Sequence, residues 1–214
     1  PDSSAGGILQ PIAAKVLMKI LYGARMARPD LLRAVCHTAS CVTKWNEQND
    51  VDLYRLVCYI RTTAEYTHVC WVGDKPEDLE LVVWADADFA GDPRTQRSTS
   101  ASATAIVGPN TRFFLSAKSQ RQTAVSHSTP EAEIVSADLA VRTEALPASS
   151  LWDHILQRTV AIRFLEDNEA VCKICKAGGS AKLMHMSRTH RVDAALVAET
   201  ITEGTIQMFY TQTM

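Results

Sequence analysis

The hydrophobic pattern of this chain changes near residue 80, and this change limits what the chain can fold into. Before it, apolar residues recur at the spacing of one helix face, as in Leu53, Leu56, Val57 and Ile60. After it, residues 81–84 form a short apolar run rich in β-formers that stops at the polar stretch 86–88. The sequence therefore predicts a helical segment over residues 1–75 and a sheet-containing domain over residues 80–214.

The second part of the chain alternates strand and helix patterns. Strand patterns lie near residues 81–84, 98–107, 112–115, 160–165 and 205–210, and helix patterns near 128–146, 170–177 and 192–201. The longest helix is expected to begin at a cap formed by Ser128 and to end before Pro147. This order predicts an α/β fold with a mixed sheet flanked by helices.

Composition excludes several classes of protein. With 46% apolar and 21% charged residues among 214, the chain is neither disordered nor of low complexity, and its length suits one or two domains. No run of about 18 apolar residues occurs, so no membrane span is predicted. Six cysteines at irregular spacing, and an amino-terminus without a signal pattern, favour reduced thiols in an intracellular protein.

Charge is distributed unevenly, although the formal net charge is only −2. Residues 93–130 and 170–192 contain no Asp or Glu but several Lys and Arg. Acid-free basic windows suit an enzyme that holds a polyanion, and a solvated basic face is the alternative. The candidate nucleic-acid contacts in these windows are Arg97, Lys118, Arg121, Lys182, Arg188 and Arg191.

Three acidic residues stand where predicted elements start or end: Asp86, Glu131 and Asp167. Because Mg²⁺ or Mn²⁺ prefers carboxylate oxygens, convergence of these side chains at one sheet edge would form a metal site. Each acid also has a purely structural interpretation. Asp86 could end a strand, Glu131 could complete the helix cap begun by Ser128, and Asp167 could precede a capped helix.

A zinc site is a weaker hypothesis. Cys172 and Cys175, followed by His185 and His190, superficially resemble a zinc finger. The spacer between the two pairs is nine residues, whereas about twelve is usual, and it contains two glycines. Buried thiols in a short helix are the preferred interpretation.

Several ordered motifs resemble a known family. DADFAGD at 86–92 with RSTS at 97–100, SAKSQRQT at 116–123, STPEAE at 128–133, EDNEA at 166–170 and SRTHRVD at 187–193 are similar to consecutive motifs of one domain. That domain is the ribonuclease H domain of copia-class LTR retrotransposon polyproteins. Upstream, LYG at 21–23 with ARPD at 27–30 resembles the connection segment that follows the reverse transcriptase palm in those polyproteins.

The resemblance implies a metal-dependent enzyme that hydrolyses the RNA strand of an RNA–DNA hybrid. On this interpretation Asp86 would bridge two metal ions, Glu131 would hold one of them and Asp167 the other. The hybrid would be recognised through its shape and 2′-hydroxyls, with the basic windows on its phosphates.

The sequence also departs from the family pattern. Family members continue past the final strand into a helix that carries a fourth active-site acid, whereas this chain stops at Met214, so a C-terminally truncated domain is expected. Asp193 matches a motif acid but is expected to be structural. The alternative function is therefore a catalytically silent, retroelement-derived subunit of a protein complex, with Trp45, Trp71 and Trp84 available for a partner interface.

Overall fold

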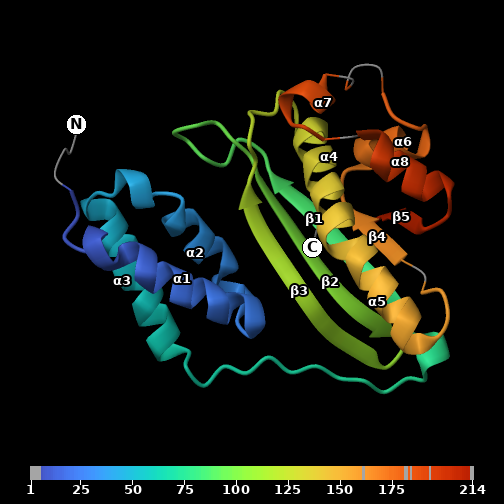
Figure 1. Ribbon diagram of the computed structural model, residues 1–214, viewed down its shortest axis with the longest axis horizontal. Coiled ribbons are helices and arrows are strands. Elements are labelled where there is room, and N and C mark those ends of the chain that lie inside the picture. Colours follow the sequence, from blue (N-terminus) through green and yellow to red (C-terminus); the bar gives the residue numbers. More distant parts are fainter. Residues whose placement is uncertain (1–5, 161, 181–182, 184, 193, 213–214) are drawn as a thin grey trace. The chain divides into compact units, whose positions relative to one another are not determined.

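Figure 1 shows the computed structural model, which describes residues 6–160, 162–180, 183, 185–192 and 194–212. The chain divides into two compact units, Pro1–Val69 and Cys70–Met214. Among the helices of the described ranges, none combines the length and apolar character that crossing a membrane requires.

The first unit is helical. Its α-helices are α1 (Gln10–Met26), α2 (Leu32–Ala39) and α3 (Glu47–Thr62), with short 3-10 turns η1 (Pro29–Leu31) and η2 (Val42–Lys44) between them. Asn46 and Asn49 exchange side-chain and backbone hydrogen bonds at the start of α3, which fixes that end of the helix. Leu17, Val35 and Leu53 are buried between the helices. The predicted N-terminal helical segment is thus confirmed.

The second unit contains a five-stranded sheet in the part of the chain that the structure describes. After the turn η3 (Pro76–Asp78), the strands are β1 (Glu80–Asp88), β2 (Thr99–Gly108), β3 (Thr111–Arg121), β4 (Ile162–Glu166) and β5 (Ile206–Tyr210), in the spatial order β3-β2-β1-β4-β5. β1, β2 and β3 pair antiparallel, whereas β4 and β5 run parallel to β1. The expected mixed sheet is therefore confirmed.

Helices enclose the core of this sheet. They are α4 (Thr129–Ala140), the π-helical segment η4 (Val141–Ala145), α5 (Leu146–Leu156), α6 (Glu169–Lys176), α7 (Met186–Thr189) and α8 (Ala194–Thr202). α4 packs on β1 and β2, while α6 and α8 pack on each other and on β5 (Figure 1). Leu81, Val83 and Phe164 are buried in the core beneath them.

The expected end of the long helix before Pro147 is wrong. Helical structure continues through Pro147 into α5, with the π-helical segment η4 just before it. Proline has no N–H with which to reach the carbonyl of Thr143, four residues earlier. The Lys118 ammonium on β3 donates to that carbonyl at 3.4 Å, so the vacated acceptor is satisfied from the sheet.

β1 is longer than its apolar run suggested, and this extension positions the acidic residues. The strand continues through Asp86 to Asp88 because those residues pair with β2. β4 lies parallel to β1 with Leu81 opposite Ile162 and Trp84 opposite Leu165. Each paired residue of β4 has a number 81 higher than its partner in β1. The same register extended by two residues places Asp86 opposite Asp167, which follows the last residue of β4.

Candidate metal centre

Three carboxylates meet at the end of β1. Asp86, Glu133 and Asp167 each offer one oxygen, and these oxygens lie within 4.8 Å of one another. Asp86 comes from β1, Glu133 from the second turn of α4, and Asp167 from the residue after β4. Two of the sequence-predicted acids, Asp86 and Asp167, are therefore brought together.

Glu133, rather than Glu131, is the third member of this group. Residues two apart on an α-helix point about 200° from each other, so the two side chains cannot face the same neighbour. The Ser136 hydroxyl, three residues after Glu133 and on its face of the helix, donates to the backbone carbonyls of Asp86 and Ala101 at 2.7 and 3.1 Å. Packing of this face against β1 and β2 therefore selects Glu133.

Burial and neighbouring negative charge raise the pKa of Asp86 and of Glu133. Burial is the largest cause for Asp86, followed by the charges of Asp167 and Asp88, and its pKa lies above the usual range. Burial, with the charges of Asp86 and Asp167, raises the pKa of Glu133 to about 8. A cation between these oxygens would relieve both the repulsion and the cost of burial.

A fourth acid, Glu166, is the last residue of β4 and interacts through its charge with Glu133, Asp167 and Asp86. Its side chain is fully buried, and one oxygen accepts the backbone N–H of Asn168 at 3.1 Å. Burial and the charge of Glu133 raise its pKa to about 8. Sequence reasoning missed both glutamates, although each sits beside a predicted ligand in a short acidic motif, E-A-E or E-D.

The donor set fits a hard divalent cation. Oε2 of Glu133 and Oε2 of Glu166 are buried and have no hydrogen-bond partner among the described residues. Buried carboxylate oxygens without a donor are costly unless a proton or a cation satisfies them. Carboxylate oxygens are also the ligands that Mg²⁺ and Mn²⁺ select, so the residues present suit such an ion.

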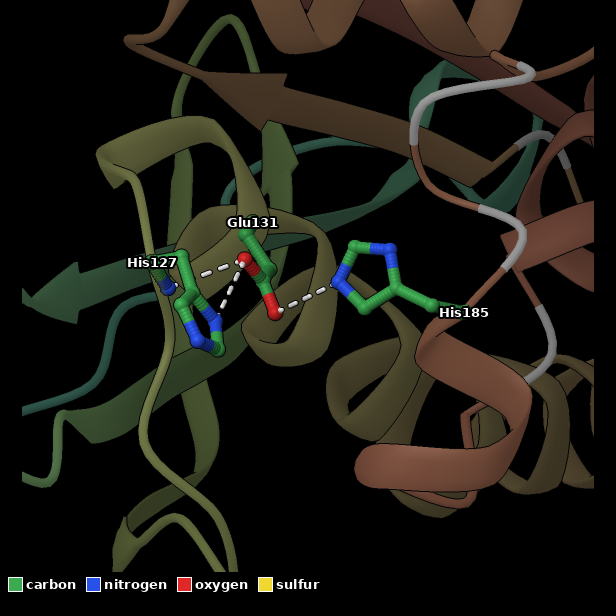
Figure 2. A group of neighbouring side chains, drawn as sticks. All are labelled: His127, Glu131 and His185. Atoms are coloured by element: carbon green, nitrogen blue, oxygen red, sulfur yellow. Dashed lines mark hydrogen bonds and ion pairs between the residues drawn. The ribbon is translucent and has the colours of Figure 1, made fainter.

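Glu131 belongs to a different group. It is 2% exposed, and its carboxylate accepts the backbone N–H of His127 at 2.9 Å and contacts Nε2 of His185 and of His190 at 3.3 and 2.9 Å. Figure 2 shows this carboxylate between the imidazoles of His127 and His185. Burial would raise the pKa of Glu131, but these hydrogen bonds outweigh it and the pKa lies below its usual range.

The capping interpretation of Glu131 is thus partly correct. The Ser128 hydroxyl accepts the N–H of Glu131 at the start of α4, as a helix cap does. The Glu131 side chain reaches back to His127 instead of to Ser128. Glu131 therefore lies with the histidines and not beside Asp86 and Asp167, where it was expected, because Glu131 and Glu133 point to opposite sides of α4.

The basic candidates fall into two sets. Lys118 forms an ion pair with Glu144 at 2.7 Å, and Arg121 forms one with Asp92 at 3.0 Å. Arg188 and Arg191 are exposed, and Arg97 is half-buried in the loop before β2. Lys182 and Asp193 lie outside the described residues.

The thiols of α6 are not part of either ligand group. Cys172 and Cys175 are buried in the core, and burial raises the pKa of Cys175 to about 12. His185 and His190 contact Glu131 instead. In the described part of the chain, the clusters able to hold a metal contain no cysteine, in line with the preference for buried thiols.

The strand order, the mixture of parallel and antiparallel pairs and the flanking helices define a ribonuclease H-like fold for the second unit. Among solved structures, the chain is similar to the PFV RNase H domain, with 15% identity and a TM-score of 0.41 over 63% of this chain and 79% of that one. It is also similar to the N-terminal RNase H domain of a Mycobacterium tuberculosis protein, with 14% identity and a TM-score of 0.37 over 63% and 83%.

A third similar structure is the foamy viral protease-reverse transcriptase in complex with dsDNA. Identity there is 11% and the TM-score 0.35, over 67% of this chain and 87% of that one. No protein-family model and no curated protein matches the chain.

Proposed function

We propose that the second unit is a metal-dependent nuclease of the ribonuclease H type that hydrolyses the RNA strand of an RNA–DNA hybrid. The observation that carries the proposal is the convergence of Asp86, Glu133 and Asp167 within 4.8 Å on a ribonuclease H-like sheet. Mutual repulsion among these oxygens destabilises the fold unless a proton or a cation neutralises it, so their convergence favours a metal-binding role.

Asp86, Glu133 and Asp167 would hold Mg²⁺ or Mn²⁺. The bound ion would supply Lewis-acid activation of water and stabilisation of the leaving oxygen. Ser136 is a positioning residue, because its hydroxyl ties α4 to the backbone of Asp86. Glu166 adds negative charge near the site.

The basic residues are assigned to two roles, binding of the hybrid and support of the sheet. Arg188 and Arg191 are exposed, and with Arg97 they are the side chains we assign to phosphate contacts. Lys118 and Arg121 are assigned instead to support of the sheet edge, since each is already paired with a carboxylate. The quoted motifs support a copia-type retroelement origin, with the helical first unit as its connection segment.

The deciding experiment is a cleavage assay with a labelled RNA–DNA hybrid and Mg²⁺ or Mn²⁺. We expect cleavage of the RNA strand, and Asp86→Asn or Glu133→Gln should reduce the rate by at least about 100-fold, because a lost ligand should cost no less than the 10–100-fold typical of residues behind the ligands. Glu169→Gln is the matched control, since this exposed acid pairs with Lys173 on α6.

The competing function is a catalytically silent subunit. One observation favours a partner surface: Trp71 is 68% exposed, although Trp45 is buried. Folded chain that cleaves the hybrid neither with Mg²⁺ nor with Mn²⁺, and whose hybrid binding is unchanged in Arg188→Met, would overturn the nuclease proposal in favour of this one.

A further inference from the structure

A second group of ligand-type side chains lies on the opposite face of α4 from the carboxylates. One nitrogen of His127, one oxygen of Glu131 and one nitrogen of His185 lie within 4.8 Å of one another. Nδ1 of His127 is 3.6 Å from Glu131 Oε2, and Nε2 of His185 is 3.3 Å from Glu131 Oε1. In Figure 2 the two imidazoles approach the carboxylate from opposite sides.

We propose that His127, Glu131 and His185 form a second metal site, selective for Zn²⁺ or a similar transition metal over Mg²⁺. Two imidazoles and one carboxylate form a recurring zinc donor set that leaves a fourth position for water. Neutral imidazole is a good ligand for such metals and a poor one for Mg²⁺. The site thus differs in chemistry from the all-carboxylate group around Asp86.

The geometry is close to that of a bound site. Zinc bonds of about 2.0–2.2 Å place ligand atoms about 3–4 Å apart in a tetrahedral centre. The imidazole rings of His127 and His185 are 6.3 Å apart between centroids and nearly perpendicular, at 84°. Their side chains are 76% and 44% exposed, so small rotations can close the site around an ion that enters from solvent.

His190 supports Glu131, the central ligand, through a hydrogen bond. Its fully buried side chain places Nε2 2.9 Å from Glu131 Oε1, and its other ring nitrogen has no hydrogen-bond partner among the described residues. The tautomer of His190 with a proton on Nε2 donates that proton to the Glu131 carboxylate in a hydrogen bond. Support of a ligating carboxylate by such a donor is the usual second layer of a metal site.

Metal binding at this site would join two distant segments of the chain. His127 precedes α4, whereas His185 precedes α7, 58 residues later. A bridging ion holds such segments together and adds its binding free energy to the stability of the fold. Zinc would therefore stabilise the attachment of α7 to the start of α4.

The experiment is calorimetric titration of the whole reduced chain with Zn²⁺, alongside Co²⁺ titration followed by absorption. We expect His127→Ala and His185→Ala each to weaken Zn²⁺ binding at this site by at least about tenfold, and the double variant to remove it. Both side chains are exposed enough for the variants to fold, which circular dichroism checks. His154→Ala, at another exposed histidine, is the matched control.

The cobalt spectrum separates this site from binding by cysteines. Co²⁺ held by imidazole and carboxylate lacks the thiolate charge-transfer bands that a cysteine site would show. Zn²⁺ affinity that stays unchanged in the double variant, or thiolate bands from the main Co²⁺ site, would overturn the proposal. Asp86→Asn should leave zinc binding at this site unchanged while removing hydrolysis, so the zinc proposal and the nuclease proposal can be tested separately.

Discussion

At the scale of single residues, the two glutamates of the E-A-E motif have different surroundings. Glu131→Gln removes charge from a buried carboxylate that forms hydrogen bonds with two imidazoles and one backbone N–H and lies 3.6 Å from Nδ1 of a third imidazole, that of His127. We expect it to lower the free energy of unfolding by about 1.5–3 kcal/mol, the range for hydrogen bonds to charged groups. Chemical denaturation measures this loss.

The paired variant Glu133→Gln is expected to do the reverse. It should preserve or raise the unfolding free energy, because it removes a buried charge and its repulsion with Asp86 and Asp167, the causes of the raised pKa of Glu133. Its hydrolysis rate should nevertheless fall far below that of Glu131→Gln. Equal loss of hydrolysis in the two variants, measured on folded protein, would contradict the assignment of Glu133.

Asp92 gives a prediction for the pH dependence of stability. The hydroxyl of Thr95, the backbone N–H of Arg94 and the guanidinium of Arg121 outweigh the effect of burial and lower the pKa of Asp92 to about 2. Since the unfolded carboxyl binds its proton more readily, this stabilisation is complete above about pH 4 and is lost as the pH falls towards 2.

The variant Asp92→Asn tests this dependence. We expect it to unfold more easily at neutral pH by about 1–2 kcal/mol, a value reduced for solvent screening. The difference from the unchanged chain should shrink steadily in acid. Denaturation curves at a series of pH values measure it, and a difference that persists at pH values near 2 would contradict the assignment.

At the scale of elements, the π-helical segment η4 and Lys118 explain how helical structure continues from α4 into α5 although α5 contains Pro147. The ammonium both pairs with Glu144 and donates to the carbonyl that Pro147 cannot reach. Lys118→Met should therefore lower the free energy of unfolding by about 1–3 kcal/mol, because it leaves a partly buried carboxylate and a carbonyl without this donor.

Arg188→Met is the matched comparison for Lys118. Arg188 is exposed on α7 and is assigned to phosphate contact, so its loss should weaken hybrid binding and reduce the salt dependence of that binding. Its effect on unfolding should stay within about 0.5 kcal/mol. A Lys118 variant that keeps full stability but loses hybrid binding would reverse the two roles.

At the scale of the whole molecule, two units with their own cores are expected to respond locally to core mutations. Leu17 is fully buried in the helical unit. Leu17→Ala should destabilise that unit by about 2–5 kcal/mol, the usual cost of this truncation in a packed core. Amide hydrogen exchange should show lost protection in α1 and α3.

Hydrogen exchange of the sheet supplies the comparison for Leu17→Ala. Protection of β1 and β4 should persist, because their core residues Leu81 and Phe164 belong to the second unit. The variant Phe164→Ala should give the opposite pattern. A uniform loss of protection along the whole chain in both variants would show that the units unfold together.

The sequence by itself determined the order and type of the main elements and the acids at the strand ends. Periodicity, caps and turn residues act locally, so the mixed sheet and the proximity of Asp86 to Asp167 could be predicted. Only the tertiary structure decided which face of α4 meets the sheet. Each residue turns a helix by about 100°, so packing through Ser136, and not the motif, selected Glu133 and left Glu131 to the histidines.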